Sequence, residues 1–153
     1  MRIIGGKYKS YIIPTSKKIK ARPTTDMAKE ALFNILENKI DFNQIYVLDL
    51  FCGTGNISYE FASRGVKEIT AVDHQINALQ FIQKQSSHWG MKINTKKKNA
   101  LSFLEITDDK YDVIFADPPY DFKRIDEIHD IIFNRKLLRD HGLFVLEHAK
   151  NKN

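Results

Sequence analysis

Residues 45–56 read IYVLDLFCGTGN, and this stretch decides the fold. The first six residues are mostly apolar and β-favouring, which predicts a buried strand over 45–50. Gly53 and Gly55 follow directly. Because neither carries a Cβ atom, they let the backbone turn tightly and approach a ligand closely. A helix over 55–64 comes next. A strand, a glycine loop and a helix in this order predict the first unit of an α/β fold.

The alternation of strands and helices continues toward the C-terminus. Further strands are predicted over residues 69–73, 91–96, 111–116 and 142–147, with helices from Ile76 to about Gly90 and over 100–105 and 124–135. Strands separated by helices require right-handed crossover connections. The pattern therefore predicts an α/β fold with a mostly parallel sheet and helices on both faces.

The first 25 residues differ from the rest in composition. Residues 2–4 and 8–13 are β-favouring runs around two glycines and predict a small hairpin. A connector over 14–25 and a helix over 26–38 follow. Residues 1–25 contain seven basic residues and no acidic one, whereas residues 26–153 carry a net charge of −2. A basic arm (1–25) on a mildly acidic domain (26–153) predicts a polyanionic partner, and the alternative is a solvated tail.

Size and composition exclude several classes of protein. The chain has 153 residues, the size of one domain, and its 42% hydrophobic residues are enough for a core. The single cysteine, Cys52, excludes an internal disulfide framework, and the five histidines lack metal-ligand spacing. No apolar run approaches the roughly 18 residues of a membrane helix, and no secretory signal precedes the first strand. We expect a soluble cytoplasmic protein with no metal and no membrane contact.

The carboxyl ends of the strands are where an open α/β sheet binds its ligand. Ser58 replaces the third glycine of the dinucleotide fingerprint, and the P-loop lysine is absent, so S-adenosylmethionine fits this loop better than a nucleotide with phosphates. Asp73 lies 18 residues after Gly55, near the offset of a ribose-binding acid, although it also suits a helix cap. Asn99 follows the third strand and either bonds to adenine or is only a loop residue.

A second motif, Asp117-Pro118-Pro119-Tyr120, follows the strand over 111–116. Without further context, two prolines after a strand indicate a stiff turn. This turn lies at the same sheet edge as the glycine loop. The Asp117 carboxylate and a proline-turn carbonyl would accept hydrogen bonds from an exocyclic base amine and stabilise its positive charge during methyl transfer. Tyr120 would stack on the base.

Four motifs together resemble the RsmD family of 16S rRNA guanine-N2 methyltransferases. They are residues 2–7 (RIIGGK), 22–26 (RPTTD), 49–55 (DLFCGTG) and 117–120 (DPPY). The resemblance implies a Rossmann-like class I S-adenosylmethionine-dependent methyltransferase fold. It also implies methylation of guanine N2 in the small ribosomal subunit as part of rRNA processing. We expect the chain to be a monomer.

The same resemblance assigns roles to individual residues. Catalysis falls to Asp117, Pro118, Pro119 and Tyr120. Cofactor contacts fall to Asp49, Phe51, Gly53, Thr54, Gly55, Asp73, Asn99 and Ala100. The residues expected to contact RNA, through salt-dependent phosphate contacts or at the mouth of the cofactor site, are Arg2, Lys7, Lys9, Arg22 and Thr24.

One departure from the family and three alternatives remain open. Family members add two strands after the fifth, whereas only six residues follow Glu147 here, so we expect these C-terminal strands to be absent. The amine chemistry would equally serve adenine N6 or cytosine N4 in DNA. A catalytically inactive RNA-binding protein is the second alternative. An NAD-dependent oxidoreductase is the third, and Ser58 and the proline turn disfavour it.

Overall fold

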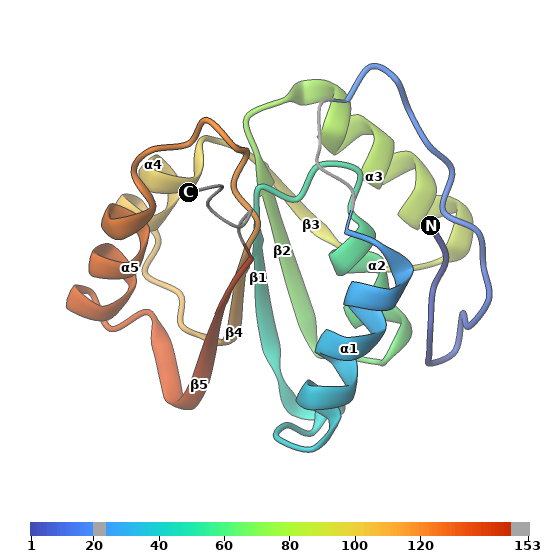
Figure 1. The fold of residues 1–153 in the computed structure, drawn as a ribbon, viewed down its shortest axis with the longest axis horizontal. Helices are drawn as coiled ribbons and strands as arrows, with labels where there is room; N and C mark the ends of the chain where they lie inside the picture. The colour runs from blue at the N-terminus through green and yellow to red at the C-terminus, as the bar shows by residue number, and fades with distance from the viewer. Residues whose placement is uncertain (20–23, 148–153) are drawn as a thin grey trace, which may run out of the picture.

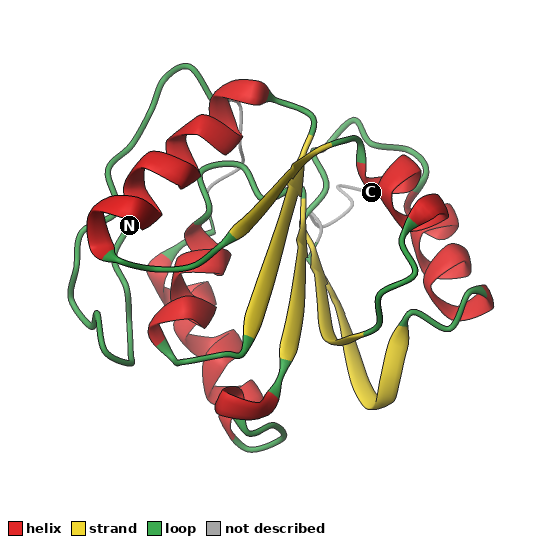
Figure 2. Ribbon diagram, turned by 180° about the vertical axis from the view of Figure 1, so that it is seen from behind, coloured by secondary structure: helices red, strands yellow, loops and turns green. Residues whose placement is uncertain are grey.

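The computed structural model describes residues 1–19 and 24–147. They form one parallel sheet with the strand order β3-β2-β1-β4-β5 and helices on both faces (Figures 1 and 2). The strands are β1 (Tyr46–Leu50), β2 (Glu68–Asp73), β3 (Asn94–Lys97), β4 (Tyr111–Ala116) and β5 (Leu138–Leu146). The helices are α1 (Asp26–Glu37), α2 (Asn56–Ser63), α3 (Ile76–Trp89), α4 (Ala100–Ile106) and α5 (Ile125–Asn134), with a short 3₁₀ turn, η1 (Phe42–Gln44). The predicted α/β fold is confirmed.

The strand order determines where a ligand can bind. The chain starts in the middle of the sheet at β1, moves outward to β3, and then returns to place β4 on the other side of β1. The direction of winding therefore reverses between β1 and β4, and open α/β sheets bind ligands at the carboxyl ends of the strands at such a point. This arrangement brings the loop after β1 next to the turn after β4.

The two faces of the sheet are apolar because side chains alternate along each strand. Leu48 and Ile114 belong to a cluster with α4 and α5. Val47 and Val113, one residue earlier in each strand, pack with α1 and α2 instead. Figure 1 shows α1, α2 and α3 on one side of the sheet and α4 and α5 on the other. Burial on both faces explains the nearly continuous apolar runs of β1 and β4.

The N-terminal segment packs on the domain. Ile3 and Ile13 are each only 1% exposed and join a cluster with Tyr59 of α2 and Leu79 of α3. The hairpin predicted over 2–4 and 8–13 forms in a short version, with an antiparallel bridge between Arg2 and Ile12 and backbone hydrogen bonds between the two runs. Further contacts, described below, join the segment to α2. The arm is therefore fixed against the domain over residues 1–19.

The ends of most elements agree with the sequence prediction, and the starts of β3 and β5 are the exceptions. β3 begins at Asn94 rather than residue 91. β5 begins at Leu138 rather than residue 142, because Leu138 pairs with Tyr111 before a register shift brings Leu143 opposite Val113. In the described residues β5 is an edge strand, and its outer edge pairs with no further strand. None of the helices in residues 1–19 and 24–147 is long and apolar enough to span a membrane.

Candidate active site

The loop after β1 and the turn after β4 line one cavity of about 420 Å³ at the carboxyl ends of the strands. Gly53 comes from the first of these segments and Asp117 from the second. Among the residues proposed for cofactor binding and catalysis, the cavity is lined by Asp49, Phe51, Gly53, Thr54, Asp73, Asp117 and Pro119. The structure thus brings together two motifs that lie more than 60 positions apart in the chain.

The backbone of the glycine loop is left-handed at three positions. Phe51 has φ of 58°, Gly53 of 53° and Gly55 of 89°. The amide of Gly53 donates a hydrogen bond to Asp73 Oδ2 at 2.9 Å, and the amide of Gln75 donates to Asp73 Oδ1 at 2.9 Å. The carboxylate of Asp73 therefore holds the loop after β1 against the loop after β2.

Gly55 has a packing role in addition to its conformation. It precedes α2 as the N-cap residue, and a Cβ atom there would lie 2.8 Å from Ile82 Cγ1 and 3.0 Å from the Tyr59 ring. The residue lets α2 start close to α3, and it is absent from the cavity lining. A contact between Gly55 and a ligand remains a prediction.

Four carboxylates line the cavity, those of Asp49, Asp73, Asp117 and Asp121. Asp49 lies in β1, is only 1% exposed and accepts a hydrogen bond from Ser58 Oγ at 2.7 Å. The pKa of Asp49 is raised to about 7, mainly by burial; the Ser58 bond lowers it, and the nearby charges of Asp117 and Asp73 raise it. Because like charges repel at short range, the cavity favours a cationic ligand. Ser58, which replaces the third fingerprint glycine, thus serves to bind Asp49.

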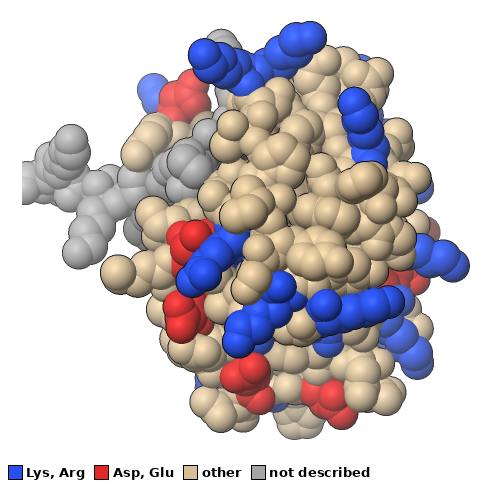
Figure 3. All heavy atoms as spheres, turned by 90° about the vertical axis from the view of Figure 1, so that its right-hand side faces the viewer, with Lys and Arg blue, Asp and Glu red and all other residues tan. Residues whose placement is uncertain are grey.

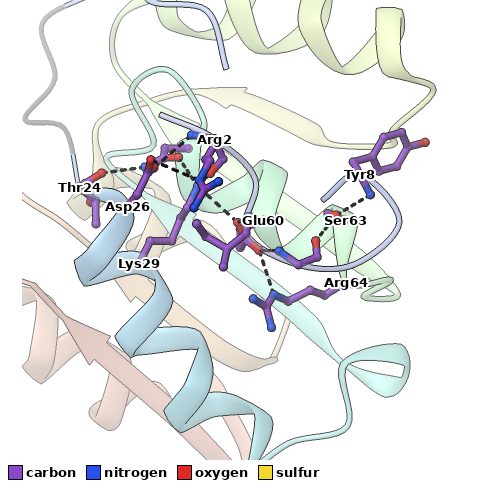
Figure 4. Close-up of polar contacts among 11 residues, drawn as sticks. Arg2, Tyr8, Thr24, Asp26, Lys29, Glu60, Ser63 and Arg64 are labelled. Atoms are coloured by element: carbon purple, nitrogen blue, oxygen red, sulfur yellow. Dashed lines mark hydrogen bonds and ion pairs between the residues drawn. The ribbon is translucent and has the colours of Figure 1, made fainter. Parts of the chain in front are cut away.

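A buried polar network behind the cavity could not be anticipated from the motifs (Figure 4). Lys29 of α1 is fully buried, with its Nζ atom 3.3 Å from Glu60 Oε1. It also donates to the carbonyl of Arg2 at 2.6 Å and to Asn56 Oδ1 at 2.7 Å. Asn56 in turn donates to the carbonyl of Thr24 at 3.1 Å and lines the cavity.

The same network anchors the N-terminal segment. The carboxylate of Glu60 accepts bonds from the amides of Ile4 at 2.9 Å and Gly5 at 3.0 Å, and from Arg64 Nε at 3.0 Å. The only signal in the sequence is a lysine within the apolar stripe of α1, four residues before the buried Phe33. The arm, α1 and the cavity wall therefore share one set of buried contacts.

Several residues proposed for the site lie outside the cavity lining. Asn99 caps α4 by accepting a bond from the Ser102 amide at 2.8 Å, which is the loop role considered for it, and Ala100 is buried at the start of that helix. Pro118 is buried, whereas Tyr120 is 77% exposed. Their cofactor and substrate roles remain predictions.

The residues proposed to contact RNA occupy two different environments. Arg2, Lys7 and Lys9 are exposed on the N-terminal segment. Thr24 is only 7% exposed and lines the cavity, which places it at the mouth rather than on the outer surface. Arg22 lies outside the described residues. Other cavity-lining residues were missed by the motifs and come from the N-terminal segment and the loops after β2 and β4. They are Met1, Thr15, Ser16, Ile19, His74, Gln75 and Asp121.

Comparison with known proteins identifies the family of the chain. The model of a family described as conserved hypothetical protein 95 matches residues 1–153. The chain belongs to this family. Ribosomal RNA small subunit methyltransferase D of Haemophilus influenzae is 31% identical, over 99% of this chain and 80% of that protein. The protein of the same name from Escherichia coli is 29% identical, over 96% of this chain and 74% of that protein.

Solved structures share the fold of this family member. The Escherichia coli protein yhhF, a proposed methyltransferase, superposes with a TM-score of 0.86 at 27% identity, covering 100% of this chain and 84% of the other. An S-adenosylmethionine-dependent methyltransferase from Agrobacterium tumefaciens gives a TM-score of 0.67 at 26% identity, covering 83% and 45%. The expected Rossmann-like methyltransferase fold and the expected family resemblance are both confirmed.

Proposed function

We propose that the chain transfers a methyl group from S-adenosylmethionine to the exocyclic N2 amine of a guanine in 16S rRNA. The observation that carries this proposal is the shared cavity, in which the glycine loop after β1 and the Asp117 turn after β4 face one space. Relatives named for methylation of small-subunit rRNA, which align with nearly the whole chain, support the choice of substrate.

The residues of the cavity fit S-adenosylmethionine. Its volume lies in the range of small-molecule sites, and its four carboxylates suit the sulfonium and ammonium charges. Asp73 accepts backbone bonds at both oxygens, and an ionised carboxylate with about four acceptor positions keeps capacity for ribose hydroxyls. Asp49, Gly53 and Asp73 would hold the cofactor, which when bound supplies an electrophilic methyl group on a positively charged sulfur.

Asp117 and the proline turn would act on the base amine. A guanine N2 nitrogen is a poor nucleophile because its lone pair is delocalised into the ring. Acceptors on its two N–H groups, the Asp117 carboxylate and a carbonyl of the turn, favour the pyramidal nitrogen and stabilise its developing positive charge. Transfer would form the N–C bond as the S–C bond of the sulfonium breaks to leave a neutral thioether, and the nitrogen would lose one proton to solvent. The ring of Tyr120, which is exposed, would stack on the base.

The N-terminal segment supplies the positive charge for RNA. Residues 1–19 carry five basic side chains and no acidic one, and Met1, Thr15, Ser16 and Ile19 of this segment line the cavity. Phosphate contacts from Lys7, Lys9 and Arg2 would give salt-dependent affinity, while the cavity selects the base. The division into an arm over 1–25 and a domain over 26–153, a monomeric state and a cytoplasmic location belong to this proposal.

Incubation with methyl-labelled S-adenosylmethionine tests the substrate. Small ribosomal subunits that lack the modification, protein-free 16S rRNA and duplex DNA serve as three acceptors. The proposal predicts label in rRNA. Label in DNA alone would indicate that the substrate is an adenine or cytosine amine of DNA. Salt-sensitive RNA binding without any heat of S-adenosylmethionine binding would identify a catalytically inactive RNA-binding protein instead.

A further inference from the structure

An aromatic ring is exposed where the N-terminal segment crosses the C-terminal end of α3. Tyr11 is 45% exposed, and the adjacent Ile12 is 70% exposed. The Tyr11 ring meets Tyr8 at 5.2 Å and Trp89 at 5.5 Å between centroids, in both cases edge to face. These two contacts fix the orientation of the Tyr11 ring while much of the side chain stays accessible.

The segment that carries this ring is firmly held. The Tyr8 hydroxyl donates to the carbonyl of Trp89 at 2.8 Å, and the Tyr8 amide donates to Ser63 Oγ at 3.0 Å. Gly6 has φ of 80°, and a Cβ atom there would lie 2.0 Å from the Ser63 carbonyl oxygen. Because a rigid aromatic side chain loses little freedom on binding, such a ring is well prepared to contact a partner.

Basic side chains lie on the same segment as the ring. Lys7 and Lys9 are exposed, and Lys7 Nζ lies 5.4 Å from the centroid of the Tyr8 ring, which in turn contacts Tyr11. Figure 3 views this side of the molecule, where lysine and arginine side chains border an uncharged central area. An exposed aromatic ring beside basic side chains is the combination that binds unpaired nucleotides, through stacking on the base and attraction of the phosphate.

We infer that Tyr11 stacks on an unpaired base of the RNA substrate while Lys7 and Lys9 contact the adjoining phosphates. The inference rests on the proposed function, since it takes rRNA as the partner. This base is distinct from the methylated guanine. The cavity lies at the N-terminal end of α3, and the 14 residues of that helix separate the two places by about 20 Å.

Three substitutions at Tyr11 separate stacking from packing. Tyr11→Phe keeps the aromatic face, Tyr11→Leu keeps apolar cover over Trp89 without an aromatic face, and Tyr11→Ala removes both. Phe133→Ala is the matched control, because Phe133 is 49% exposed on α5, on the other side of the sheet. Each variant is assayed for KM and kcat with unmodified small subunits, and for affinity toward protein-free 16S rRNA and S-adenosylmethionine.

The stacking role predicts a specific pattern. Loss of one stacked base weakens binding by about 1–3 kcal/mol, or roughly 5- to 150-fold. Tyr11→Leu and Tyr11→Ala should raise KM for subunits, and weaken rRNA binding, at least fivefold, with kcat and S-adenosylmethionine affinity unchanged. Tyr11→Phe and Phe133→Ala should resemble the unaltered protein.

Three results would overturn the inference. If Tyr11→Leu binds rRNA as tightly as Tyr11→Phe, the ring only covers Trp89. If KM for subunits rises while affinity for protein-free rRNA is unchanged, the ring contacts a ribosomal protein. If all variants share the KM of the unaltered protein, the surface contacts no substrate. If the unaltered protein methylates no acceptor, the proposed function is wrong. The affinity of the Tyr11 variants for protein-free 16S rRNA then still tests whether the ring contacts RNA.

Discussion

Asp49 should make the binding of S-adenosylmethionine depend on pH. Burial is the main reason why its pKa is about 7, and the charges of Asp117 and Asp73 add to it. A cationic ligand in the same cavity favours the ionised carboxylate, so binding should release a proton below pH 7. With a pKa of about 7, roughly one-tenth of Asp49 is ionised at pH 6 and nine-tenths at pH 8. If binding requires the ionised form, affinity should rise about tenfold between these pH values.

Isothermal titration calorimetry at pH 6, 7 and 8, in buffers of different ionisation enthalpy, measures both affinity and proton release. Asp49→Asn is the matched variant, because an amide oxygen can still accept the bond from Ser58 Oγ. It should bind more weakly at pH 8 and lose the dependence between pH 6 and 8. Asp130→Asn, an exposed change on α5, should behave as the unaltered protein does. An unaltered protein with constant affinity from pH 6 to 8, or an Asp49→Asn variant that keeps the tenfold change, would refute this reasoning.

Three further changes test other parts of the structure. Asp49→Asn should also be more stable than the unaltered protein at pH 8 but not at pH 3.5. Because folding raises the pKa of Asp49 from 3.8 to about 7, ionisation of Asp49 costs stability as the pH rises from about 4 to about 7. Urea unfolding at both pH values would detect the difference. Lys29→Met should lower the free energy of unfolding by about 3 kcal/mol, and Tm by roughly 6–12 °C, because it removes one partner of a buried ion pair. An unchanged thermal transition would contradict the stabilising role of the network. Changing Lys7 and Lys9 together to Gln should weaken RNA binding and lower the slope of log affinity against log salt by about 2, whereas an equal slope would mean that these side chains are only solvated.

Local signals in the sequence were sufficient to predict most of the fold. Apolar runs define the strands, and helix ends carry their own markers, such as the left-handed Gly90 after α3 and the capping Asn99 before α4. The early part of β5 was missed, since residues 138–141 (LRDH) are largely polar and pair with β4 only through a register shift. Pairing of this kind depends on tertiary contacts and leaves no periodic pattern.

The candidate site was predicted in part, for a similar reason. The positions of Gly53 and Asp117 follow from the rule that ligands bind at the carboxyl ends of parallel strands. The pairing of Lys29 with Glu60, 31 positions away, does not follow from any local pattern. Nor does the burial of Ile3 and Ile13, which packs the predicted basic arm against the domain.

The most direct test of the account is to separate cofactor binding from methyl transfer at Asp117. Asp117→Ala should bind S-adenosylmethionine with nearly unchanged affinity, because the carboxylate acts on the base amine. Nucleoside analysis of 16S rRNA by mass spectrometry should find labelled N2-methylguanosine with the unaltered protein and none with this variant. Normal turnover by Asp117→Ala, or label in a different nucleoside, would contradict the claim that these two loops bring donor and amine together.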